Sequence, residues 1–307
     1  MMGKSKEKYI VVYNSSAGKG KSYTVARKIA NCLAEFGKED IVVFSNNKIE
    51  NLHNHFMFCE EKPHGTVIAV GGDGTLSTVV NAVVLNDIEM NIAVYPCGTA
   101  NDFASSLKVP KSIKKFVKMI ISETPINCDI IKVNDVYGIN AVGSGNFSHA
   151  GEVYDPRLKK IFGKFAYYSK CVKSSLSMKS NRLKIEFSDG KCVEDDFLFY
   201  YAVNSKVAGG FRNFYKKAKI DDGKFGFIGI KKCGFIAFCF LFLKILLGIH
   251  ANSKYVVFKE DTCLKVTLIG ENKKFIKSDI DGNIGPNHPL EISVIKDKIK
   301  VYSKSRG

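Results

Sequence analysis

The first third of the chain alternates short apolar runs with segments of helical periodicity, and this alternation constrains the fold more than any other feature. The apolar runs predict four strands, at Tyr9–Tyr13, Ile41–Phe44, Thr66–Val70 and Ile92–Tyr95. Apolar residues at helical spacing predict helices between them, at Ser22–Phe36, Ile49–Phe58 and Thr75–Leu85. Strands that alternate with helices pair in parallel, because each crossover helix returns the chain to the same end of the sheet. The sequence therefore predicts an N-terminal doubly wound α/β domain.

After about Pro125 the pattern changes to alternating apolar and polar residues, which is typical of antiparallel strands. Asn181–Val203 contains Asp189-Gly190, which predicts a hairpin turn. Further strands are expected at Lys254–Leu268, Lys274–Ile280 and Pro289–Tyr302 (the last with a turn at Lys296–Lys298), and helices near Leu158–Leu176 and Phe235–Leu247. We therefore expect residues 1–128 to form the first domain, and residues 129–307 a C-terminal antiparallel β-rich domain.

Positive charge is concentrated in the second of these domains. The chain has 46 Lys and Arg against 30 Asp and Glu, a net charge of +16, and residues 129–307 carry +13 of it. Such a field attracts phosphates, nucleic acid or anionic lipid head groups. No arginine-rich stretch, zinc-finger spacing or RNA-recognition signature is present in the sequence. The charge therefore argues against nucleic acid. It leaves two alternatives, which are phosphate or lipid partners and an ordinary solubilising surface rich in lysine.

The cysteine pattern and the start of the chain predict a cytoplasmic protein. The nine cysteines are scattered singly and form no CxxC pair, which argues against a disulfide framework and a zinc site. The polar segment Met1–Lys8 runs directly into the first predicted strand and shows no signal-peptide pattern.

Gly234–Ile249 is the most apolar segment, with 16 residues and a single charge at Lys244. A membrane span needs about 20 apolar residues, so this segment is too short to favour one. It predicts either a helix packed into the core or a helix that lies at a lipid surface.

The strongest candidate for a binding site is the loop Gly71-Gly72-Asp73-Gly74-Thr75 after the third strand. In doubly wound sheets, ligands bind beyond the carboxyl ends of the strands. Glycines let the backbone approach a polyphosphate, and the N-terminus of the following helix attracts negative charge. A carboxylate fits there if Asp73 contacts Mg²⁺ or orients a hydroxyl or water. The alternative is that Asp73 only caps the helix.

Two further loops follow the first and fourth strands. Asn14–Ser22 looks like a Walker A loop but has Ser15 where that motif needs glycine. It predicts either a backbone that faces a phosphate or a simple flexible loop. Pro96–Phe103 supplies Gly, Thr, Asn and Asp side chains beside the second loop, although Asn101 or Asp102 could equally be the N-cap of a helix at Phe103–Leu107. Two such loops on neighbouring strand ends predict a shared phosphate site.

These motifs carry a family resemblance. Gly71–Val84 (GGDGTLSTVVNAVV) followed by Tyr95–Leu107 (YPCGTANDFASSL) resembles the catalytic domain of the diacylglycerol kinase superfamily, specifically the soluble bacterial lipid kinases. Weaker resemblances follow in the family's order, to its Asn-Pro-x-Ser-Gly loop, acidic turn, Gly-x-His element and late Asp-Gly-Glu motif, at Asn14–Gly18, Ala218–Gly223, Leu247–His250 and Asp279–Asn283. The resemblance spans about residues 9–302.

The resemblance implies an ATP-dependent lipid kinase that phosphorylates a lipid hydroxyl, typically converting diacylglycerol into phosphatidic acid for phospholipid biosynthesis. It implies that the last strands return toward the first domain, that Asp222 holds a structural Mg²⁺ with neighbouring backbone carbonyls, and that Asp281 is the candidate base. By position, the ATP site would be lined by Asn14, Ser45, Gly71, Gly72, Asp73, Gly74, Thr75, Leu76, Ser77, Thr99 and Asn101.

The residues themselves suit phosphoryl transfer, which depends on positioning and charge neutralisation more than on covalent help. Asp73 and Asp281 compete for the role of base, and the sequence leaves that choice open. Asn283 stands where the family usually has glutamate. On a single strand Asp279, Asp281 and Asn283 would face one side, so Asp279 is expected to compensate for the missing carboxylate.

Two other functions stay open. A catalytically impaired homologue that binds nucleotide or anionic lipid is supported by Asn283, and an NAD kinase would share the GGDGT loop but not PCGTANDF. For the lipid kinase we expect peripheral membrane association, with the basic half of the chain against an anionic leaflet and Phe235–Leu247 near the acyl boundary. The resemblance also allows a homodimer.

Overall fold

The computed structural model describes residues 7–15, 20–45, 49–59, 61–145, 180–269 and 277–304. The chain forms two compact units, one made of Met1–Ile130 with Lys296–Gly307 and the other of Ile131–Ile295. The first unit is thus assembled from both ends of the chain. The predicted helix near Leu158–Leu176 and the first residues of the predicted strand Lys274–Ile280 lie outside the described residues.

Four parallel strands form the sheet of the first unit, in the order β2-β1-β3-β4. They are β1 (Lys8–Tyr13), β2 (Ile41–Ser45), β3 (Gly65–Gly71) and β4 (Met90–Pro96). The last residue of the long strand β15 (Leu290–Val301) joins this sheet, because Val301 pairs in parallel with Ile92. The four predicted strands and their parallel pairing are confirmed.

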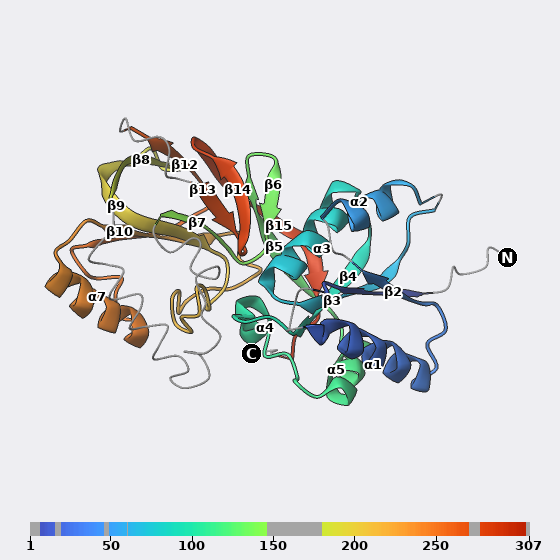
Figure 1. The fold of residues 1–307 in the computed structure, drawn as a ribbon. Coiled ribbons are helices and arrows are strands. Elements are labelled where there is room, and N and C mark those ends of the chain that lie inside the picture. Colours follow the sequence, from blue (N-terminus) through green and yellow to red (C-terminus); the bar gives the residue numbers. More distant parts are fainter. Residues whose placement is uncertain are drawn as a thin grey trace. The chain divides into compact units, whose positions relative to one another are not determined.

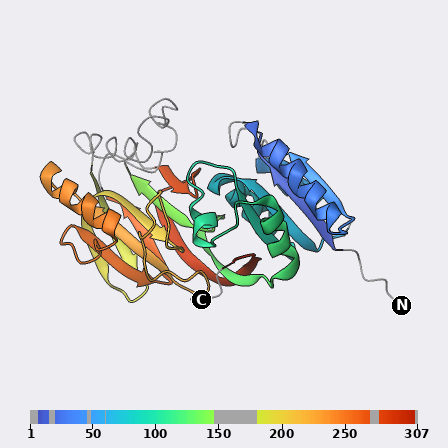
Figure 2. The same ribbon diagram turned by 90° about the horizontal axis from the view of Figure 1, so that it is seen from below.

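Helices cover both faces of this sheet, as Figures 1 and 2 show. The helices are α1 (Ser22–Glu35) and α5 (Ile113–Ser122) on one face, and α2 (Ile49–Met57) and α3 (Asp73–Leu85) on the other. Successive strand residues point to opposite faces, and one face of β1 and β3 packs its apolar side chains against Ile29 of α1 and Phe116 of α5. This arrangement confirms the doubly wound α/β prediction.

The second unit is built from antiparallel strands, as predicted. Its sheet has the order β14-β13-β7-β9-β8-β12-β15, and β10 pairs with β9 and β11. Its other strands are β6 (Val136–Gly138), β7 (Ala141–Gly145), β8 (Asn181–Phe187), β9 (Cys192–Val203), β10 (Phe225–Lys231), β11 (Val256–Asp261), β12 (Cys263–Leu268), β13 (Lys277–Ile280) and β14 (Asn283–Asn287). Strand β5 (Ile126–Val133) begins in the first unit and ends in the second. Gly190 has φ +80° in the turn between β8 and β9, which confirms the predicted hairpin.

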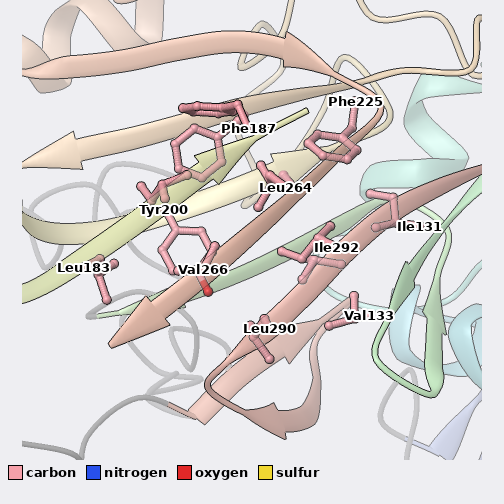
Figure 3. Packing of buried hydrophobic residues seen from close by; sticks show 14 of the residues in the cluster. Ile131, Val133, Leu183, Phe187, Tyr200, Phe225, Leu264, Val266, Leu290 and Ile292 are labelled. Atoms are coloured by element: carbon pink, nitrogen blue, oxygen red, sulfur yellow. The ribbon is translucent and has the colours of Figure 1, made fainter. Parts of the chain in front are cut away.

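The central strand β9 supplies side chains to two hydrophobic clusters. Phe197 and Tyr200 belong to the cluster that Figure 3 shows, whereas Leu198 and Phe199 belong to a second one. Strict alternation would put Phe197 and Phe199 in the same cluster. The register against β10 shifts between Phe197 and Phe199, so Leu198 is an extra residue that resets the alternation.

Helix α7 (Phe235–Leu247) lies beside β10 (Figure 1) and packs against the second of these clusters. Its side chains Phe238, Leu241, Phe242 and Ile245 are buried there, together with Ile228 of β10. The helix has the predicted bounds and ends where Gly248 adopts φ +63°. Within the described ranges, no helix combines the length and apolar character that crossing a bilayer requires.

Two predictions about the last strands are wrong. No turn occurs at Lys296–Lys298, because β15 continues through Asp297, whose N–H donates to the buried Asp129 carboxylate at 2.8 Å. Asp279 and Asn283 do not share a strand either, because Asp281 and Gly282 form the turn between β13 and β14.

Candidate functional site

The predicted nucleotide residues gather at the carboxyl ends of the parallel strands of the first unit. Asn14 follows β1, Ser45 ends β2 and Gly71 ends β3, while Thr99 and Asn101 follow β4. The strand order reverses between β1 and β3, since β2 lies beside β1 and β4 lies beside β3. Such a reversal point at the carboxyl ends is where open α/β sheets bind ligands.

The loops after β3 and β4 meet backbone to backbone. The carbonyl of Gly71 accepts hydrogen bonds from the N–H groups of Cys97 at 2.8 Å and Gly98 at 3.1 Å. A Cβ atom on Gly98 would lie 2.4 Å from the Cα of Gly72, which is closer than any side chain could be placed without moving the backbone. Glycine at position 98 therefore permits a contact that leaves a surface of bare backbone, which suits the close approach of a phosphate chain.

Asp73 begins α3, but its carboxylate serves the short helix α4 (Asp102–Ser106). It accepts the N–H groups of Asp102 and Phe103, each at 3.1 Å. Asn101 is the residue before α4 but makes no capping bond, because its side chain exchanges two hydrogen bonds with Gly98, each at 2.8 Å. The free N–H groups at the N-terminus of α4 are therefore capped by Asp73, which is distant in the sequence, and not by Asn101, which directly precedes the helix. This role of Asp73 was not predicted from the sequence.

Burial raises the pKa of the Asp73 carboxyl, and the backbone N–H groups of Phe103 and Asp102 oppose this effect. The folded state thus keeps the Asp73 proton to a higher pH than the unfolded chain, whose carboxyl has a pKa of 3.8. Stability from this group is therefore expected to fall as the pH rises from 3.8 through the folded pKa, and then to level off.

The measurement is the free energy of unfolding of the wild type and Asp73→Asn from about pH 3 to about pH 7. We expect the difference between wild type and Asp73→Asn to decline with pH over the acid part of this range. Asp87→Asn, at a carboxylate that is 82% exposed, is the control. A difference that grows with pH would contradict the expectation.

The other residues predicted for the nucleotide site differ in how exposed they are. Thr75, Leu76 and Ser77 are buried, with exposed fractions of 6%, 0% and 3%, so little of these residues is accessible to a ligand. Thr99 is exposed. Asn14 accepts a hydrogen bond from the buried Ser22 hydroxyl on its carbonyl at 2.5 Å, which joins the two ends of the first loop. Residues 16–19 of that loop lie outside the described part of the chain.

Asp281, the candidate base, lies in the second unit and is 5% exposed. Its carboxylate accepts three backbone hydrogen bonds, from Ile139 at 2.7 Å, Asn140 at 2.9 Å and Ala141 at 2.8 Å. Its own N–H donates to the carbonyl of Ala141 at 2.9 Å, and its φ is +53°. Asp281 therefore holds the segment between β6 and β7 against the turn that follows β13.

Asn283 is the first residue of β14 and pairs with Ile280. The carboxylate of Asp279 accepts the Gly282 N–H at 3.0 Å, so it stabilises the same turn. The expectation that Asp279 lies on one strand face with Asp281 and Asn283 is therefore wrong. The geometric reason for expecting Asp279 to replace the family's glutamate is lost as well.

Asp222 lies in the exposed turn before β10, where its carboxylate accepts the Lys224 N–H at 3.1 Å. Partial burial and the nearby carboxylates of Glu260 and Asp221 raise the pKa of Asp222, against the lowering effect of Lys224. Negative charge is therefore crowded at this turn, which fits a divalent cation. Among the described residues, no group of three or more His, Cys, Asp or Glu has the geometry of a complete metal site. Backbone carbonyls or water would have to complete the coordination.

Two features of the site could not be predicted from the sequence: Glu260 lies near Asp222, and the Asp73 carboxylate accepts N–H groups of α4. Both relations join residues far apart in the chain, 38 positions in the first case and 29 in the second. No short-range pattern marks them, because they follow from the strand pairing β10–β11 and from the packing of neighbouring loops.

Comparison with known proteins shows that the chain is similar to a class of kinases in sequence and in fold. Residues 8–133 match the family model of the diacylglycerol kinase catalytic domain. This match confirms the resemblance to the diacylglycerol kinase catalytic-domain superfamily that the GGDGT and PCGTANDF loops predict.

More particular relatives share the whole length of the chain. Diacylglycerol kinases of Staphylococcus aureus and Staphylococcus saprophyticus are each 26% identical over 95% of this chain, and the matches cover 91% and 94% of those proteins. The crystal structure of a diacylglycerol kinase from Bacillus anthracis superposes with a TM-score of 0.76 at 24% identity and covers 98% of both chains. The two-part fold is therefore shared with this kinase structure.

Proposed function

We propose that the protein transfers the γ-phosphate of ATP to the hydroxyl of a lipid, and that diacylglycerol is the acceptor. The proposal rests on one observation. The backbones of Gly72 and Gly98 are in contact at the carboxyl ends of β3 and β4, beside the N-terminus of α3. N–H groups and a helix dipole can hold a polyphosphate there without a side chain in the way. The 26% identity to the staphylococcal diacylglycerol kinases supports the choice of lipid.

In this proposal each part of the chain has a limited task. The glycine loops position the phosphates, and the Asp73 carboxylate keeps the loop after β4 in place through α4. Asp281 and Asp73 remain the two candidates for accepting the proton of the lipid hydroxyl. Each carboxylate is already held by backbone N–H groups, so either would act from a fixed position.

The crowded carboxylates around Asp222 fit the Mg²⁺ ion that the resemblance implies. Asp222 would hold the ion with backbone carbonyls of its turn, and Glu260 would balance its charge from β11. Magnesium bound to ATP supplies charge neutralisation during phosphoryl transfer, whereas an ion at this turn would stabilise the second unit.

A lipid panel tests the proposal. We expect radiolabelled ATP and Mg²⁺ with mixed micelles of diacylglycerol to give labelled phosphatidic acid, and sphingoid bases or prenyl alcohols to give less product. Absence of turnover with every neutral or sphingoid lipid would overturn the proposal. ATP binding without turnover, together with activity restored in Asn283→Glu, would instead indicate an impaired kinase homologue.

A further inference from the structure

Helix α7 is apolar on both of its faces. Its buried face packs into the second hydrophobic cluster through Phe238, Leu241, Phe242 and Ile245. The opposite face exposes Ile236, Phe240, Leu243 and Leu247, with exposed fractions of 72%, 65%, 55% and 63%. These four residues follow one another at intervals of four, three and four, so they form a single stripe along the helix.

A stripe of this kind is unusual on a protein surface. Isolated exposed hydrophobic residues are normal, but a contiguous apolar patch marks a surface that contacts a partner. Phe235, the first residue of the helix, and Ile249, two residues beyond its end, are also exposed, at 41% and 55%. A helix that is apolar all round is buried in a core or placed against lipid, and here only half of it is in the core.

The chain segments next to the stripe are rich in lysine, although Lys231 and Lys259 form ion pairs with Asp195 and Asp189. From Gly223 to Lys259 the chain has six lysines and no acidic residue, and from Ser205 to Ile220 it has four lysines, one arginine and no acidic residue. Lys232 precedes α7, Lys244 lies on it, and Lys216 approaches its C-terminus, where a Cβ on Gly248 would be 2.6 Å from the Lys216 Cε. All three are exposed, and none forms an ion pair with another described residue.

This combination selects one kind of partner. A second copy of the chain would pack stripe against stripe in an isologous contact, which would bring the same lysines of both copies together. Protein interfaces also have cores depleted in charge. A lipid leaflet with anionic head groups instead accepts apolar side chains at the acyl boundary and neutralises cations around them.

We propose that the exposed face of α7 is a docking surface for anionic lipid bilayers, with Ile236, Phe240, Leu243 and Leu247 inserted at the acyl boundary and Lys216, Lys232 and Lys244 among the head groups. This surface needs no catalysis to act. It can therefore be present whether or not the proposed kinase reaction takes place, and it can be tested separately.

Flotation of the full chain with vesicles tests the proposal. The vesicles are pure phosphatidylcholine or phosphatidylcholine with phosphatidylglycerol, each at low and high salt. We expect binding to the mixed vesicles that weakens with salt, and a loss of affinity of about ten-fold or more in the double variant Phe240→Ser, Leu243→Ser. The matched control is Phe58→Ser with Leu85→Ser, at residues that are 76% and 51% exposed in the first unit.

A second variant separates charge from apolar insertion. Lys216→Gln with Lys244→Gln is expected to weaken binding to the anionic vesicles by about ten-fold and to leave binding to pure phosphatidylcholine unchanged. The thermal unfolding midpoints of all variants should stay near the wild-type value, because the substituted side chains are exposed. Wild-type vesicle binding by the Phe240, Leu243 variant would overturn the proposal. So would a dimer of the wild type that this variant abolishes while no vesicle binding is seen.

Discussion

Replacing Asp281 with alanine is expected to lower the free energy of unfolding by roughly 3–5 kcal/mol. The substitution removes the acceptor for the N–H groups of Ile139, Asn140 and Ala141. Asp281 is only 5% exposed, so water does not readily replace its carboxylate. A buried donor left without a partner costs about 1–3 kcal/mol. Alanine in the left-handed conformation at this position, φ +53°, adds about 1 kcal/mol.

Two comparisons separate these effects. Asp297→Ala tests conformational strain alone, because Asp297 also has φ +53° but an exposed side chain, and it should cost about 1 kcal/mol. Asp281→Asn keeps an acceptor for Asn140 and Ala141 and tolerates positive φ, so it should be less destabilising than alanine. Urea denaturation of the four proteins is the measurement. Equal stabilities of Asp281→Ala and Asp297→Ala would show that the three hydrogen bonds contribute little.

The asparagine variant also bears on catalysis. If Asp281 accepts the proton from the lipid, Asp281→Asn should lose about 10²–10⁴-fold in turnover while it remains folded. If Asp281 only holds the segment before β7, turnover should follow stability, and Asp73 becomes the preferred candidate for the base.

Gly98→Ala is expected to reduce ATP-dependent turnover by about 100-fold or more, since small displacements of a positioning loop have effects of this size. The added Cβ would lie 2.4 Å from the Cα of Gly72 and 2.9 Å from the Oδ1 of Asn101. Neither the backbone of Gly72 nor the hydrogen-bonded amide of Asn101 can move without opening the contact between the two loops.

The measurements are ATP affinity and steady-state turnover with the best lipid of the panel. Gly234→Ala is the matched control, because a Cβ there meets nothing within 4 Å and the backbone has no positive φ. Turnover of Gly98→Ala within about ten-fold of the wild type would show that the loop contact does not position the phosphates.

Much of the fold could be predicted from the sequence wherever the signal is periodic and local. Strands β1, β3 and β4 and helix α7 could be located from their runs of apolar residues, because a continuous apolar run marks a buried element without reference to the rest of the chain. The glycine loops could be assigned to strand ends for the same reason. Their predicted role as a nucleotide site remains a prediction.

The failures have a common physical cause, which is contact between distant parts of the chain. Lys-Asp-Lys at 296–298 looks like a turn, but the Asp129 carboxylate holds the Asp297 N–H and the strand continues. Asp279, Asp281 and Asn283 look like one strand face, but Asp281-Gly282 is a turn fixed by the backbone of Ile139 to Ala141. In both cases hydrogen bonds between a buried carboxylate and the backbone of a distant segment decide the local conformation, and no local pattern reports them.

The assembly of the first unit from both chain ends sets an order of events during synthesis. Val301 pairs with Ile92, and the Tyr302 hydroxyl lies 3.3 Å from that of Thr66, inside a unit whose other residues end at Ile130. All of Ile131–Ile295 must be translated in between, which takes on the order of 10–30 s at about 5–20 residues per second. During that time the parallel sheet of the first unit lacks the strand residues that come from the end of the chain, so the first part to be made is among the last to be completed.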